Sequence, residues 1–90
     1  MTKPEKDYMN SVAALGCAIC RINGLDTPAE IHHARTGTGL RRASHFDTIP
    51  LCFIHHRGAE GLHTLGRKRW EKFHSVIELD ILAETKKMLA

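Results

Sequence analysis

The chain has 90 residues, of which 42% are hydrophobic and 26% charged, with a formal net charge of +3. These values fit one small globular domain and exclude a collagen-like, low-complexity or wholly disordered chain. No apolar run approaches the roughly 18 residues of a membrane-spanning helix. The first seven residues are largely charged and no apolar stretch follows them, so we expect no secretory signal and a cytoplasmic protein. The positive charge favours an anionic partner only mildly.

The first predicted element is a helix over about residues 4–15. Pro4 suits its first turn, where the missing N–H has no partner to lose. Gly16 follows and is suited to end the helix in a left-handed conformation. Apolar side chains recur between these ends at helical spacing and form one stripe, which consists of Tyr8, Val12 and Leu15.

Residues 17–47 are expected to be mostly loop, with one short apolar piece at residues 29–34. Residues 35–42 hold two glycines, two threonines and three arginines, so this segment is predicted to be flexible and basic. A short extended piece is predicted at residues 48–52, because Pro50 biases the residue before it towards β geometry.

The rest of the chain is predicted to be helical. A helix is expected to begin near Cys52 and to weaken at Gly58 and Gly61, so that it can break before His63. Further helices are expected over residues 67–90.

Two features of this C-terminal part can be located more closely. Trp70 and Phe73 share a helix face and are predicted to be core residues rather than a platform for stacking bases. Ser75 and Glu78 have the spacing of a capping box, which would start the last helix at Val76.

Two short motifs have the spacing of metal ligands. Cys17 and Cys20 are separated by two residues, and so are Cys52 and His55. Two such knuckles place four donors around one tetrahedral zinc, and a domain this small gains folding free energy from the metal. The alternatives are three buried thiols with a surface histidine, or a redox Cys-x-x-Cys. No βαβ pattern surrounds the motif, which disfavours a thioredoxin-like role.

Histidines are concentrated in the middle of the chain, where six of the seven lie between residues 32 and 63. On a strand, His32 and His33 would point to opposite faces and would have different tasks. A neutral imidazole is both a good metal ligand and a base with a pKa near neutral pH. An incidental histidine pair is the alternative.

These motifs occur in a fixed order: Cys-x2-Cys, EIHH (30–33), DTIPLCFIHH (47–56) and HTLG (63–66). The order resembles the HNH nucleases with a ββα-metal core. It is most similar to the small phage and prophage branch of RecA-dependent nucleases used in recombination enhancement. The resemblance implies an α+β fold, in which a small zinc-stabilised ββα-metal (HNH, His-Me finger) domain spans residues 1–90. Its core would cover about residues 17–70, flanked by an N-terminal helix and by C-terminal helices over about 67–90.

The resemblance also implies residue roles. His33 would be the general base that activates water. Asp47, in the place usually held by Asn, would orient this base by holding its loop. A structural Zn²⁺ would be held by Cys17, Cys20, Cys52 and His55. A catalytic divalent metal (Mg²⁺, Mn²⁺, Ni²⁺ or Zn²⁺) would be held by His32, His56 and His63.

Three positions depart from the family pattern. Asp47 replaces Asn, so it accepts hydrogen bonds but does not donate them at neutral pH. His55 replaces a cysteine. His63 follows His56 by seven residues, which is two helical turns. It would face the metal if the helix continues, and solvent or DNA if the helix breaks at Gly58.

Basic residues flank these motifs. Arginine forks suit phosphate groups, and such contacts do not depend on base sequence. We therefore predict DNA contacts from Arg35, Arg41, Arg42, Arg57, Arg67, Lys68 and Arg69. The alternative is a solvated basic surface. His45 and His74 receive no assigned role, although His45 is close enough to Asp47 in the chain to join an outer shell.

Together these features predict a metal-dependent DNA endonuclease or nickase of HNH type, a phosphodiester hydrolase associated with phage or prophage recombination in the bacterial cytoplasm. DNA is the expected substrate. A RecA-type recombinase filament is a partner that only the resemblance implies, and no membrane partner is expected. The alternatives are a non-catalytic zinc-dependent DNA-binding or recombination accessory module, and a structural phage protein that retains the fold. The sequence leaves open the strandedness of the DNA, any sequence preference, the catalytic metal and the oligomeric state.

Overall fold

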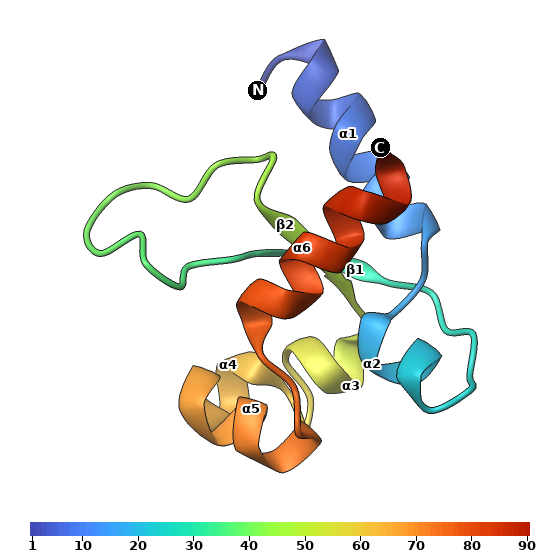
Figure 1. The fold of residues 1–90 in the computed structure, drawn as a ribbon, viewed down its shortest axis with the longest axis vertical. Helices are drawn as coiled ribbons and strands as arrows, with labels where there is room; N and C mark the ends of the chain where they lie inside the picture. Colours follow the sequence, from blue (N-terminus) through green and yellow to red (C-terminus); the bar gives the residue numbers. More distant parts are fainter.

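The computed structural model describes residues 1–90 and has a small α+β fold, in agreement with the predicted class (Figure 1). In chain order the elements are α1 (Lys3–Ala14), α2 (Ala18–Ile22), β1 (Glu30–His33), β2 (Thr48–Leu51), α3 (Phe53–His56), α4 (Leu62–Leu65), α5 (Arg67–His74) and α6 (Glu78–Leu89). None of these helices combines the length and the apolar character needed to cross a membrane.

The predicted N-terminal helix is confirmed as α1. Thr2 and Glu5 form a capping box at its start, in which the Glu5 amide donates to the Thr2 hydroxyl and the Thr2 amide to the Glu5 carboxylate. Gly16 ends the helix with a φ of +78°, as predicted. Val12 is fully buried on the inner face of the helix.

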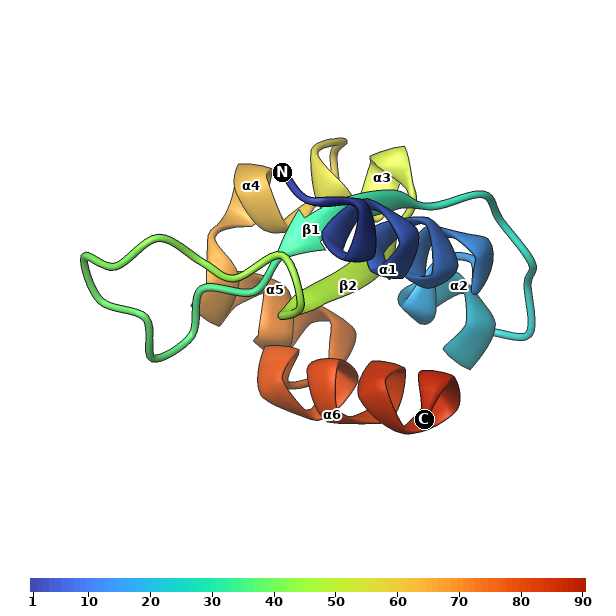
Figure 2. The same cartoon turned by 90° about the horizontal axis from the view of Figure 1, so that it is seen from above.

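The predicted extended piece at residues 48–52 is confirmed as β2, and it pairs antiparallel with β1, which lies in the short apolar piece at residues 29–34. His32 lies opposite Ile49, and His33 opposite Thr48. Both strands are edge strands, so Pro50 in β2 is tolerated. Helix α6 lies across the sheet, and α1 packs against both strands (Figures 1 and 2). The sheet therefore lies in the middle of the fold and positions the histidine pair there.

One hydrophobic core joins the metal-ligand motifs to the C-terminal helices. The Trp70 side chain is completely buried, and its indole N–H donates to the His55 carbonyl at 3.0 Å. The prediction that Phe73 is a core residue is wrong, because this side chain is 62% exposed. Short helix α5 buries only its tryptophan against the body. The core consists of Cys17, Ala18, Ile19, Cys20, Ile49, Leu51, Cys52, Leu62, Trp70 and Ile81.

The predicted capping box at the last helix is also wrong. Ser75 adopts a left-handed conformation, with a φ of +56°, and ends α5. Helix α6 begins at Glu78 rather than at Val76, and the Glu71 carboxylate accepts a hydrogen bond from the Glu78 amide at 2.7 Å. Glu71 therefore caps α6, which leaves the Glu78 side chain available for another contact.

The expected break after the second histidine pair is confirmed. Helix α3 ends at His56, and a tight turn leads into α4. A Cβ atom on Gly58 would lie 2.7 Å from the Ile54 Cα, and one on Gly61 would lie 2.7 Å from the Arg57 nitrogen. Both positions therefore require glycine, and the tight turn that they allow returns α4 to α3.

Candidate metal centres and active site

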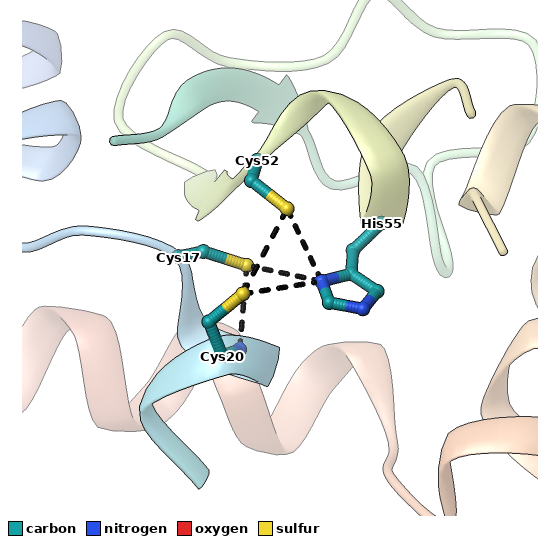
Figure 3. A group of neighbouring side chains, drawn as sticks. All are labelled: Cys17, Cys20, Cys52 and His55. Carbon is teal, nitrogen blue, oxygen red and sulfur yellow. Dashed lines mark hydrogen bonds between the residues drawn. The ribbon is translucent and has the colours of Figure 1, made fainter. Parts of the chain in front are cut away.

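The Cys-x2-Cys and Cys-x2-His motifs come together in space. The cysteine sulfurs and the His55 ring point toward one another (Figure 3). The His55 Nδ1 lies 3.5 Å from the sulfurs of Cys17 and Cys20 and 3.2 Å from that of Cys52. The sulfurs of Cys20 and Cys52 are 3.9 Å apart. The three cysteines are buried and form no disulfide, and His55 is partly buried.

Local structure explains this convergence. In each motif the first cysteine is the N-cap of a short helix, and the second ligand follows three residues later on the same helix face. The first of these helices, α2, was not predicted, because five residues are too few for a recognisable helical pattern. The Cys17 sulfur accepts a hydrogen bond from the Cys20 amide at 3.5 Å, a contact that lowers the pKa of Cys17 less than burial raises it.

The spacing of the four donors fits a tetrahedral metal ion. With usual zinc bond lengths, a tetrahedron has sulfur–nitrogen edges of about 3.5 Å and sulfur–sulfur edges of about 3.8 Å. The distances given above lie close to both values. This group could therefore hold a metal such as zinc, which would tie α2 to the segment that begins α3.

Metal uptake at this group is expected to release protons. Burial raises the pKa of the Cys17 thiol to about 11, so without metal this thiol is protonated at neutral pH. The ligand must be a thiolate. Metal affinity should therefore rise with pH, by about tenfold per pH unit for each proton displaced. Calorimetry of zinc binding in buffers of different ionisation enthalpy measures the proton count. An enthalpy that is independent of the buffer would contradict this prediction.

A second group of potential ligands consists only of histidines. His32 from β1, His56 from α3 and His63 from α4 place their ring nitrogens within 4.8 Å of one another. The Nε2 atoms of His56 and His63 are 3.0 Å apart. His63 thus reaches the group even though the helix breaks before it, because the turn at Gly58 and Gly61 returns the chain. These three residues could hold a divalent metal.

Two carboxylates lie behind this histidine group, and the sequence indicated no role at this group for either of them. Glu78 Oε2 lies 2.8 Å from the His32 Nε2, and Glu30 Oε1 lies 2.8 Å from the His56 Nδ1. Hydrogen bonds from Arg57 and His56 lower the pKa of Glu30 to about 2. Burial acts to raise the pKa of Glu78, but hydrogen bonds to its charged form outweigh this and lower it to about 2. Both side chains are therefore carboxylates at neutral pH. Glu30 shares a strand face with His32, a signal that could have pointed to it.

His33 points away from the histidine group, as strand alternation predicts. Its Nε2 lies 2.9 Å from the Nδ1 of His45, and the two rings meet edge to face. Burial, together with the nearby rings of His45 and His32, lowers the pKa of His33. A His33 ring that is neutral at neutral pH can accept a proton. His45 lies just before β2, and only the folded chain brings it beside His33.

The carboxylate of Asp47 does not contact the His33 ring. It forms an ion pair with Lys86 of α6 at 2.7 Å. The Asp47 carbonyl accepts a hydrogen bond at 2.8 Å from Ala34, the residue after His33. Asp47 is therefore linked to the end of β1 through its backbone and to α6 through its side chain.

A third group, made of His55, Glu60 and His74, is not an independent site. His55 already turns its Nδ1 toward the three sulfurs, so its Nε2 would carry the remaining proton when that group binds metal. Glu60 lies 3.8 Å from this Nε2. Glu60 therefore belongs to the surroundings of the cysteine-rich group.

Comparison with known proteins supports a nuclease. A family model described as "Recombination enhancement, RecA-dependent nuclease" matches residues 1–87. The chain belongs to this family. No curated protein and no solved structure matches the chain. The family description makes the chain a RecA-dependent nuclease of recombination enhancement, and a nuclease of this kind takes DNA as its substrate.

For this RecA-dependent nuclease, the predicted DNA-binding residues fall into three groups. Arg57 is held by Glu30 at 2.6 Å, and Arg67 by Glu71 at 3.1 Å. The guanidinium groups of the loop arginines 35 and 41 contact only loop carbonyls, at 3.4 Å. Arg42, Lys68 and Arg69 are exposed and have no side-chain partner.

The basic loop that carries three of these arginines projects from the body of the nuclease, where it is drawn in green (Figures 1 and 2). The start of the loop is held by hydrogen bonds, because the Thr36 amide and hydroxyl donate to the Glu78 carboxylate at 3.0 and 2.6 Å. The loop therefore starts beside the histidine group and extends outward from it.

Proposed function

We propose that this RecA-dependent nuclease is a metal-dependent DNA endonuclease or nickase of HNH type, formed by one domain over residues 1–90. In this proposal β1, β2 and α3 are the ββα-metal unit. One observation carries the proposal: His32, His56 and His63 gather on one side of β1, while His33, the next residue of the strand, faces another way. A metal group and a separate base are the two parts that phosphodiester hydrolysis needs.

The catalytic metal would be held by His32, His56 and His63. When bound, it would stabilise negative charge on the scissile phosphate and on the leaving 3′ oxygen. A set of imidazoles suits Mn²⁺, Ni²⁺ or Zn²⁺, and Mg²⁺ with several waters is also compatible with the reaction. A separate structural Zn²⁺ would be held by Cys17, Cys20, Cys52 and His55.

His33 would act as the general base. A histidine that acts as a general base needs one ring nitrogen with a free electron pair. If the His33 Nε2–H donates to the His45 Nδ1, the free pair is on the His33 Nδ1. This atom takes a proton from water, the new bond forms between the water oxygen and phosphorus, and the bond to the 3′ oxygen breaks. Asp47 would hold the loop by its backbone bond to Ala34 and its ion pair with Lys86.

The proposal is tested by nicking of supercoiled plasmid with Mg²⁺, Mn²⁺ and Ni²⁺ supplied in turn, with and without a recombinase filament. We expect nicking with at least one metal. Failure to cut under every condition, with DNA binding intact, would overturn the enzyme proposal. The protein would then be a zinc-dependent DNA-binding or recombination accessory module.

The arginines of the basic loop are expected to bind phosphate groups of the DNA. Replacing both Arg41 and Arg42 by Ala should weaken binding to unrelated duplexes equally. The slope of log affinity against log salt should fall by about 0.9 for each phosphate of duplex DNA that the variant no longer neutralises. Fluorescence anisotropy over a salt series measures this slope. Lys6→Ala, at an exposed position of α1, is the control for loss of a positive charge away from the loop. An unchanged slope in the double variant would mean that these arginines form a solvated surface.

A further inference from the structure

Glu78 is the most deeply buried charged side chain that the proposed mechanism does not use. It is 1% exposed, yet it belongs to α6, while its partners belong to β1 and to the start of the basic loop. One carboxylate oxygen lies against the His32 ring. The other accepts hydrogen bonds from the Arg35 amide at 3.2 Å and from the amide and hydroxyl of Thr36. Burial of a carboxylate is costly, and these four contacts compensate for it.

The contact between Glu78 and His32 selects one form of the imidazole. A carboxylate only accepts hydrogen bonds, so the His32 Nε2, 2.8 Å away, must carry the proton. In the neutral ring the free electron pair is then on Nδ1. Nδ1 is therefore the atom that His32 can present to a metal.

Glu30 selects the opposite nitrogen of His56. The Glu30 carboxylate lies 2.8 Å from the His56 Nδ1, which must carry the proton. The His56 Nε2 then has the free pair, and this is the atom that faces the His63 Nε2. Arg57 binds both oxygens of Glu30, at 2.9 and 2.6 Å, and holds the carboxylate in place.

We propose that Glu78 and Glu30 are positioning residues that make His32 bind the divalent metal through Nδ1 and His56 bind it through Nε2. This inference rests on the proposed function, because it concerns the same histidine group. Histidine ligands of metals usually donate their second N–H to a carboxylate or carbonyl, which fixes the ring and raises its basicity. Glu78 also holds Thr36, so the same carboxylate links the metal group to the loop that is proposed to contact DNA.

A purely structural role for Glu78 makes a different prediction. In that case Glu78 would act only by anchoring Thr36. Loss of the Thr36 contact would then change metal affinity as much as loss of the Glu78 carboxylate does. Thr36→Val removes the hydroxyl contact at 2.6 Å and leaves the contact to His32 in place. Glu84→Gln removes one negative charge from an exposed position of the same helix. These two variants are the matched controls.

The first experiment is titration of the zinc-loaded protein with Ni²⁺ by calorimetry. Loss of an outer carboxylate typically weakens metal binding by about 10- to 100-fold, and we expect this for Glu78→Gln and for Glu30→Gln, with unchanged zinc content and circular dichroism. The two control variants should bind Ni²⁺ within about threefold of wild type. Equal affinity of wild type and both glutamine variants would overturn the inference, as would an equal loss in the Thr36→Val control.

The second experiment does not depend on any variant folding. Long-range ¹H–¹⁵N spectra of the wild-type zinc-loaded protein at about pH 8, above the usual pKa of a free imidazole, report which ring nitrogen carries the proton. We expect Nε2–H for His32 and Nδ1–H for His56, and the reverse assignment for His32 would overturn the inference. If the wild type binds no metal beyond its zinc, the metal group of the proposed function fails. If the wild type binds Ni²⁺ and the glutamine variants bind it equally well, only the present inference fails.

Discussion

Cys20→Ala is expected to leave the chain largely unfolded at temperatures where the wild type is folded. The sulfur of Cys20 is one of four donors around the proposed zinc, and its side chain is buried. Structural zinc binds with an apparent free energy of about 10–16 kcal/mol. A domain of this size has a net stability of only about 5–15 kcal/mol. Loss of even part of the zinc-binding free energy is therefore comparable to the whole free energy of unfolding of the domain.

The measurements are zinc content by elemental analysis and thermal unfolding by circular dichroism, each with and without a chelator. Ile22→Ala is the matched control, because Ile22 lies on the same short helix but is exposed. We expect the control to keep its zinc and its melting curve. Pure wild-type protein without zinc, and with a melting curve that a chelator does not change, would contradict the zinc assignment.

His33→Ala is expected to abolish most DNA cleavage while the fold, the zinc content and the affinity for DNA stay the same. The His33 ring belongs to neither the cysteine-rich group nor the histidine group, so its loss removes no proposed ligand. Loss of a general base typically lowers the rate by about 10²- to 10⁴-fold. The defect should therefore appear in the rate of nicking at saturating DNA and metal.

His74→Ala is the control variant. The His74 Nε2–H donates a hydrogen bond to the Glu60 carbonyl, outside the proposed active site. We expect this variant to nick at close to the wild-type rate. Cleavage by His33→Ala at the wild-type rate would leave a nuclease in which a different group serves as the base. His45, 2.9 Å from His33, would be the first residue to examine next.

The contact between His33 and His45 shows how far the sequence could predict the active site. Strand alternation predicted that His33 turns away from His32, and this depends only on the pleat of the backbone. Asp47 was predicted to orient His33 by holding its loop. In the structure its carbonyl accepts a hydrogen bond from Ala34 and its carboxylate reaches Lys86, while the side chain beside the His33 ring is His45. The position of a residue in a motif could not reveal which side chain contacts the His33 ring, because this contact depends on how the end of the loop packs against α6.

Local features were predictable because short stretches of backbone determine them. The two metal-ligand pairs each span one helical turn, Gly16 ends α1 in a left-handed conformation, and the break at Gly58 follows from the lack of a Cβ atom. In each case the interacting groups are close along the chain. Their geometry then follows from spacing and from backbone conformations that few residues can adopt.

Contacts between distant elements were decided only by the tertiary structure. Glu78 has the sequence signature of a helix cap, but α6 packs across the sheet and turns this carboxylate inward to His32, 46 positions away. His63 reaches His56 across a broken helix for a similar reason, since the turn returns α4 to α3. Burial of a charged group requires partners, and these come from whichever elements the packing of the core brings together. The sequence by itself therefore determined the ligand pairs. The packing of α6 across the sheet brought Glu78 to His32, and the return of α4 to α3 brought His63 to His56.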